Sequence, residues 1–189
     1  MVGYMVSSVK KNIYKILKLC LWLVLGVAVG CLLPTLFSAD TKEIADKISA
    51  GILSGLQGGA ELHRVCFWGE FLPYALIVAV LWLTGGGRFG AFPAMAALFV
   101  YGVFWGIGIN IVFALSFAYG MLVFLLCMLP GNLMIAGALI LIIIITGEQN
   151  GGFAGYSYSF IAPLLMVLAG CWYLVFGGPF LLNFVIKLI

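Results

Sequence analysis

Charged residues are scarce in this chain, which excludes a protein that folds in water alone. Only 8% of the 189 residues are Asp, Glu, Lys or Arg, whereas 65% are hydrophobic and the mean hydropathy is +1.26. Soluble domains carry roughly 25% charged residues, which cover their water-exposed surface. Membrane lipid must therefore be the solvent for much of this surface, and the length allows several spans of roughly 20 residues each.

Residues suited to catalysis or metal binding are also few. The chain has one histidine, His63, and none of its five cysteines lies at CxxC spacing. The sequence contains no HExxH or P-loop motif. It therefore predicts no enzyme, no cofactor and no metal site. Nucleic acid is not an expected partner, because no stretch alternates basic and aromatic residues.

The N-terminal region is the most basic part of the chain. Four lysines precede the first apolar run: Lys10, Lys11, Lys15 and Lys18. By the positive-inside rule, residues 1–15 lie in the cytoplasm and Ile16–Leu36 is a retained first span. The GxxxG spacing of Gly26 and Gly30 allows another helix to approach closely, although glycine is also common in membrane helices generally.

Further apolar stretches place the whole chain, 1–189, in one all-α polytopic membrane domain of about five spans. The second span is Phe67–Leu83, the third lies within Phe89–Phe117, and the last is Ser159–Phe176. The sequence Gly-Gly-Pro ends this last span. The tail Phe180–Ile189 is then expected to be a short interfacial helix.

The remaining apolar stretch, Met121–Thr146, contains a helix-breaking sequence. Three consecutive residues form the break: Pro130, Gly131 and Asn132. Proline followed by glycine does not continue a regular helix comfortably, so two half-helices are predicted, Met121–Met128 and Leu133–Thr146. The stretch either crosses the membrane as a broken helix or re-enters it. A crossing puts the C-terminus outside, and a re-entrant segment puts it inside.

Residues 37–66 are the only extended polar segment, and the order of the spans makes them an extracytoplasmic loop. Four aliphatic residues recur there at every fourth position: Ile44, Ile48, Ile52 and Leu56. This spacing predicts one face of a short amphipathic helix, which begins with a capping box of Asp40 and Glu43. The apolar face either binds an extracytoplasmic partner or packs against the protein's own spans.

Three polar residues lie within the apolar spans: Glu70, Asn110 and Asn132. Glu70 is close to the outer end of the second span. It either contacts a proton or cation, or it is an interfacial residue that reaches headgroup water or pairs with Arg64. The two asparagines either hydrogen-bond across helices or line a substrate path.

The order of these features, and three short segments, resemble the stage II sporulation protein M family of bacterial membrane proteins. The segments are Phe104-Trp105-Gly106-Ile107-Gly108, Leu129-Pro130-Gly131-Asn132-Leu133 followed by Ala138-Leu139, and Pro179-Phe180-Leu181-Leu182. The similarity spans roughly residues 20–189. Family members often carry a glutamate shortly before the C-terminal proline, where this chain has none. Some relatives also place His and Glu around the proline segment, where this chain has Gly131, Asn132 and Ile135.

The resemblance implies a non-enzymatic role in the bacterial cell membrane. The sporulation members act in engulfment of the forespore and recruit the peptidoglycan-degrading stage II sporulation proteins D and P. The leading hypothesis is therefore a membrane scaffold that assembles other membrane or cell-wall proteins. The alternative is a small permease or the membrane subunit of a transporter, which a broken helix favours. A homo-oligomer is compatible with both.

Overall fold

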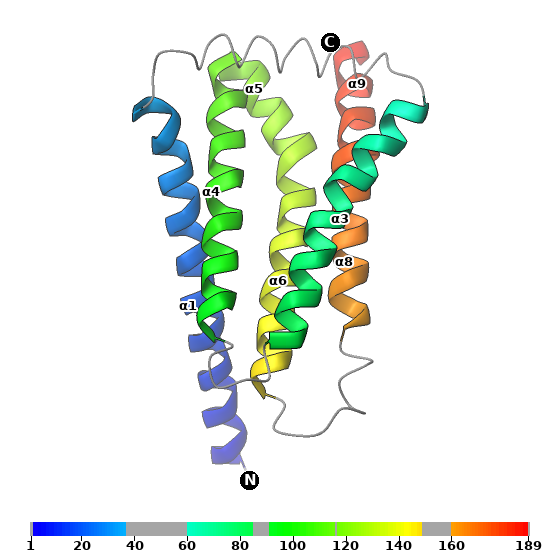
Figure 1. Ribbon diagram of the computed structural model, residues 1–189. Helices are drawn as coiled ribbons and strands as arrows, with labels where there is room; N and C mark the ends of the chain where they lie inside the picture. The colour runs from blue at the N-terminus through cyan, green and yellow to red at the C-terminus, as the bar shows by residue number, and fades with distance from the viewer. Residues whose placement is uncertain (1, 37–59, 85–90, 116, 149–159, 189) are drawn as a thin grey trace.

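The computed structural model describes residues 2–36, 60–84, 91–115, 117–148 and 160–188 (Figure 1). In this part of the chain every regular element is helical, and five segments are long and apolar enough to cross a membrane. The predicted all-α membrane bundle of five spans is confirmed. The protein is thus a multi-pass membrane protein.

The first three spans are single helices, and the last two are composite. The single helices are α1 (Val2–Leu36), α3 (Ala60–Thr84) and α4 (Ala91–Leu115). The fourth span consists of α5 (Phe117–Val123), the π-helix η1 (Phe124–Met128) and α6 (Leu129–Glu148). The fifth consists of α8 (Ile161–Trp172), the π-helix η2 (Tyr173–Gly177) and α9 (Gly178–Leu188). We call the end of the bundle at which α1 ends and α3 begins the upper end, as drawn in Figure 1.

The fourth span differs from its prediction, because Pro130, Gly131 and Asn132 do not break it. The chain passes from η1 into α6 in helical conformation, with φ −61° and ψ −52° at Leu129. It crosses once, so the two termini lie at opposite ends of the bundle (Figure 1). Neither half-helices nor a re-entrant segment form, because a widened turn before the proline gives its ring room.

Two further boundaries differ from those expected. α9 (Gly178–Leu188) continues the fifth span, whose apolar part is Ile161–Val185, so the C-terminal tail is not a separate interfacial helix. α3 begins at Ala60, so residues 60–66 are its first turns and not part of the loop. The predicted amphipathic face lies outside the described residues: Ile44, Ile48, Ile52 and Leu56.

The first span packs chiefly against α4 through glycines on both helices. A Cβ atom at Gly30 would overlap the carbonyl oxygen of Val103, and one at Gly106 would overlap that of Val27. Gly26 is equally close to α4. Since any larger side chain would push the backbones apart, the GxxxG spacing in α1 is a packing motif within the chain.

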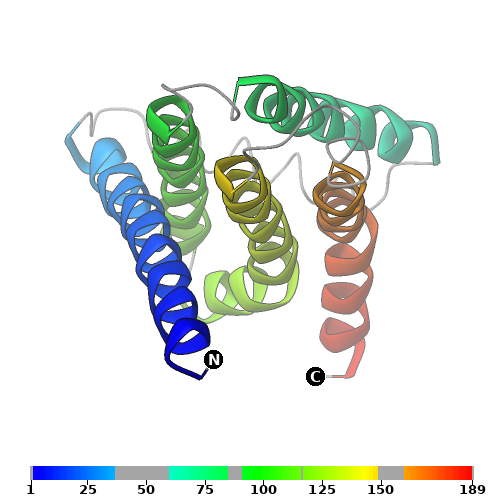
Figure 2. The same ribbon diagram turned by 90° about the horizontal axis from the view of Figure 1, so that it is seen from below.

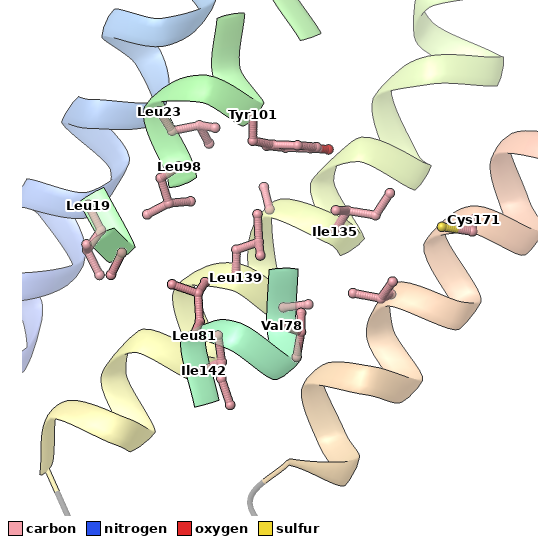
Figure 3. Close-up of a cluster of buried hydrophobic side chains, with 14 residues drawn as sticks. Leu19, Leu23, Val78, Leu81, Leu98, Tyr101, Ile135, Leu139, Ile142 and Cys171 are labelled. Carbon is pink, nitrogen blue, oxygen red and sulfur yellow. The ribbon is translucent and has the colours of Figure 1, made fainter. Parts of the chain in front are cut away.

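The lower half of the bundle is a closed aliphatic core around α6. Four residues on one side of α6 are completely buried: Ile135, Ala138, Leu139 and Ile142. Side chains of α3 and α4 cover them: Val78, Leu81, Ala94 and Leu98 (Figure 3). Among the described residues, close packing of apolar groups around this side of α6 leaves no polar path along it.

α3 crosses the bundle obliquely. Its lower end lies between α4 and α8, whereas its upper end lies beyond α9 and away from α4 (Figures 1 and 2). The upper parts of α3 and α4 therefore diverge (Figures 1 and 2).

Candidate functional site

A buried hydrogen-bonded network lies in the middle of the bundle. The Tyr101 hydroxyl, on α4, donates to Oδ1 of Asn132 at 2.8 Å and lies 3.1 Å from the Asn132 carbonyl oxygen. Asn132 is only 7% exposed, and its Nδ2 donates to the Met128 carbonyl oxygen at 2.8 Å. The ring of Tyr74, on α3, packs edge-on against Tyr101 with centroids 5.6 Å apart. The network thus joins three spans and satisfies polar groups that would be costly to bury alone.

This network lies near the membrane midplane. Tyr101 is close to the middle of the third span, Phe92–Phe113, and Asn132 is close to the middle of the fourth, Gly120–Ile145. Tyr74 touches Tyr101 and so shares this depth. Glu70 is one helical turn higher on α3, a rise of about 6 Å.

The second span itself gives the same height for Glu70. Glu70 is four to five residues above the middle of Cys66–Leu83, a rise of about 7 Å. Near it, the ring of Phe67 lies 6.2 Å from that of Phe176 in the fifth span. Glu70 is therefore inside the apolar layer, about one helical turn above its middle.

Glu70 lies on the side of α3 that faces the bundle. Ile77 and Leu81 occupy the same side at helical spacing, and both pack against the core. Glu70 itself is exposed, although it lies on this side. The same change occurs along α4, where Ala97 packs against the core but Phe104, two turns higher on the same side, is 67% exposed.

The second to fifth apolar spans supply no positive charge to match Glu70. Lys, Arg and His occur only at positions 10–18, 42–64, 88 and 187, so these four spans contain none. Among the described side chains, none hydrogen-bonds or ion-pairs with Glu70. An ionisable group inside the membrane usually has a partner.

A second unsatisfied polar group lies at the same height. Trp105 is one turn above Tyr101 on α4, and the two ring centroids are 6.4 Å apart. Its Nε1 is buried and has no hydrogen-bond acceptor in the described part of the chain. Tyr101 is level with Tyr74, so Trp105 is level with Glu70. A buried donor nearly always has a partner, and the described side chains supply none to this N–H.

Pro130 accounts for the widened turn of the fourth span. It has no N–H, and its ring crowds the carbonyl of Leu126, four residues earlier. The Leu129 N–H donates instead to the Phe124 oxygen, five residues back, as in a π-helix. The Leu126 carbonyl then accepts a hydrogen bond of 2.7 Å from the hydroxyl of Tyr173 in the fifth span. The neighbouring span thus replaces the donor that proline lacks.

The fifth span repeats this arrangement. The N–H of Gly178, which precedes Pro179, donates to the Tyr173 oxygen five residues back. In both spans an aromatic residue followed by leucine precedes the proline at the same spacing, as Phe124-Leu125 and Tyr173-Leu174 show. The sequence thus contains a short repeat, which is associated with a π-helix at each occurrence.

The two π-helices meet at mid-depth in antiparallel orientation. A Cβ atom at Gly178 would lie 2.6 Å from the Cα of Cys127, and one at Gly131 would lie 2.5 Å from the Cγ of Leu174. Glycine at these two positions allows the spans to touch. π-Helical turns within α-helices are frequent at functional sites, where they supply carbonyl groups that the helix itself does not use.

Asn110 belongs to a different contact. Its Nδ2 donates to the Cys31 carbonyl oxygen at 2.9 Å and joins α4 to α1, next to the glycine interface. Of the three polar residues singled out from the sequence, the structure therefore brings Glu70 and Asn132 to the two ends of one aromatic network and places Asn110 apart from it.

No protein-family model matches the chain, and comparisons with curated proteins and with solved structures find no match either. The function must therefore be inferred from the residues and their geometry.

Sequence reasoning missed the aromatic members of the site. They are Tyr74, Tyr101, Trp105 and Tyr173. Tyr and Trp usually lie at the ends of membrane spans, where the ring is in lipid and the polar atom reaches water. Tyr or Trp in the middle of a span is the signal that identifies these residues, since their polar atoms then need a partner inside the protein.

Proposed function

We propose that this protein is a non-enzymatic membrane scaffold that recruits other proteins in the bacterial cell membrane. The observation that supports it best is the exposed carboxyl group of Glu70. It lies about one helical turn above the membrane midplane on the inward side of α3, and the second to fifth apolar spans contain no cation to match it. A charge-bearing group in this position is complemented by another molecule.

The closed lower half of the bundle favours binding of a partner protein over transport of a solute. Polar groups extend inward from Glu70 to Asn132 and end there, because the side of α6 below Asn132 is buried among aliphatic side chains at Ile135, Leu139 and Ile142. A site that is open above and sealed below suits a binding partner that enters from the upper end or from the bilayer. It does not suit a solute that must leave on the other side.

The resemblance to the stage II sporulation protein M family supports the same proposal. With the N-terminal lysines in the cytoplasm, the upper end of the bundle is extracytoplasmic. The recruited proteins are then membrane or cell-wall proteins with domains on that side, and stage II sporulation proteins D and P are the candidates that the resemblance supplies. In that setting the scaffold acts in engulfment and needs no cofactor of its own.

The second candidate is a small permease or the membrane subunit of a transporter. The paired π-helices favour it, because irregular helices that meet at mid-depth are typical of transporter sites. Movement at Pro130 and Pro179 would have to open the aliphatic lower half before anything could cross.

The scaffold proposal is tested by purification of the tagged protein from its native membranes, with identification of the proteins that accompany it. The double substitution Ile48→Asp with Ile52→Asp alters the predicted apolar face of the outer loop and leaves all five spans intact. We expect normal membrane insertion and loss of the extracytoplasmic partner. The matched control, Ala50→Asp with Ser54→Asp, adds the same charge to the opposite face of the predicted helix and should retain the partner.

One result would contradict the scaffold, and two would show that the partner does not bind the apolar face of the outer loop. If the wild-type protein is accompanied by lipid alone, it is no scaffold. If both double variants retain their partner, recognition does not use the outer loop and lies within the bilayer. If the first variant fails to insert, the apolar face packs against the spans.

A further inference from the structure

We propose that Glu70 is the docking point for a transmembrane helix of another protein, which carries a Lys or Arg residue at mid-depth. This inference rests on the scaffold function and specifies how the partner is recognised. The pairing joins a carboxylate and a cation that are each costly to expose to lipid alone.

The face on which such a helix would lie is the exposed side of α3 around Glu70. Gly69, Glu70 and Pro73 are exposed there, and a Cβ atom at Gly69 would have no atom within 4 Å. Leu72 and Leu76 are exposed on the same part of the helix. We call these five residues the α3 face. Its small residues beside Glu70 allow close approach of a helix backbone, as at other helix contacts in membranes, and its apolar residues provide area to pack against.

Other occupants fit this face less well. A second copy of the chain has no basic residue in the second to fifth spans and would bring another carboxylate to the contact. The cationic headgroups of lipids lie at the membrane surface, about 10 Å or more above Glu70, if the spans match a hydrocarbon core of about 30 Å. A small cation would use the carboxylate but not the apolar residues around it. A basic residue on a helix uses both, because its apolar stem packs while its charge reaches the carboxylate.

An aromatic ring beside Glu70 adds to this preference for a cation. Tyr74 is one turn below Glu70 on the same side of α3, where its ring packs against Tyr101. Faces of aromatic rings attract ammonium and guanidinium groups, most strongly where water is excluded.

The inference is tested with the full-length protein in phosphatidylcholine vesicles and two synthetic transmembrane peptides. Both are Leu/Ala helices that differ only at the centre, where one has Lys and the other Leu. Association is measured by energy transfer between labels on protein and peptide. We expect the Lys peptide to bind wild-type protein at least about tenfold more tightly than the Leu peptide. Glu70→Gln should remove this preference while the protein remains folded. Glu148→Gln removes a carboxyl group at the lower end of α6 and should leave the preference unchanged.

Equal binding of the two peptides to wild-type protein would overturn the inference, as would a preference that survives Glu70→Gln. Competition by methylammonium or sodium ions at concentrations that do not affect the Leu peptide would instead identify a small-cation site and also overturn it. The scaffold function is tested separately. If Glu70→Gln keeps its protein partners in native membranes, docking at Glu70 is wrong and the scaffold stands. If wild-type protein has no partner there but prefers the Lys peptide, the site stands and the scaffold is wrong.

Discussion

The hydroxyl of Tyr173 replaces the backbone donor that Pro130 lacks, and a double-mutant cycle measures this replacement. Tyr173→Phe removes the 2.7 Å hydrogen bond to the Leu126 carbonyl oxygen. Interhelical hydrogen bonds in membrane proteins contribute about 0.6 kcal/mol on average and up to about 1.7 kcal/mol. Because this carbonyl has lost its helix donor to proline, we expect a loss near the upper limit, about 1–1.7 kcal/mol of unfolding free energy. In Pro130→Ala protein the new N–H can bond to Leu126, so the same change should cost less than about 0.5 kcal/mol.

The cycle is measured by reversible unfolding in mixed detergent micelles, followed by helical circular dichroism. Tyr14→Phe, at a highly exposed position on α1, serves as the control and should be neutral. A coupling of about 1 kcal/mol between positions 130 and 173 is expected. If Tyr173→Phe costs the same with and without the proline, the hydroxyl does not substitute for the missing N–H, and the explanation of the π-helix in the fourth span is refuted.

Two further predictions concern packing and topology. Gly30→Ala places a Cβ against the Val103 carbonyl and should lower the unfolding free energy by about 1–3 kcal/mol in the same assay. The control Gly69→Ala, with no atom within 4 Å of its Cβ, should change it by less than about 0.5 kcal/mol. Equal effects of the two substitutions would contradict the α1–α4 contact. In intact cells a membrane-impermeant maleimide should modify Cys66, which is exposed at the upper part of α3, and should spare the cysteines of the other spans. Modification of Cys66 only after permeabilisation would invert the proposed orientation.

The number and nature of the spans could be predicted from hydropathy, because lipid requires long apolar helices wherever the chain crosses. The glycines of the first span could likewise be identified as a site of close approach. Their partner could not, since α4 is one of several glycine-containing spans and only the structure brings Gly106 against Val27.

The course of the fourth span could not be predicted, because the donor that satisfies Leu126 comes from Tyr173, far away in the sequence. Local rules recognise that Pro130 removes a hydrogen bond, and they predict a break unless another group replaces it.

The central claim is that Glu70 recruits a partner within the membrane, and quantitative co-purification from native membranes tests it most directly. Wild-type protein, Glu70→Gln and the control Glu148→Gln are compared at equal expression, with partners measured by isotope-labelled mass spectrometry. The account predicts that the control retains a partner whose transmembrane helix carries Lys or Arg, and that Glu70→Gln retains at least about tenfold less of it. Equal recovery of that partner with Glu70→Gln would contradict the claim.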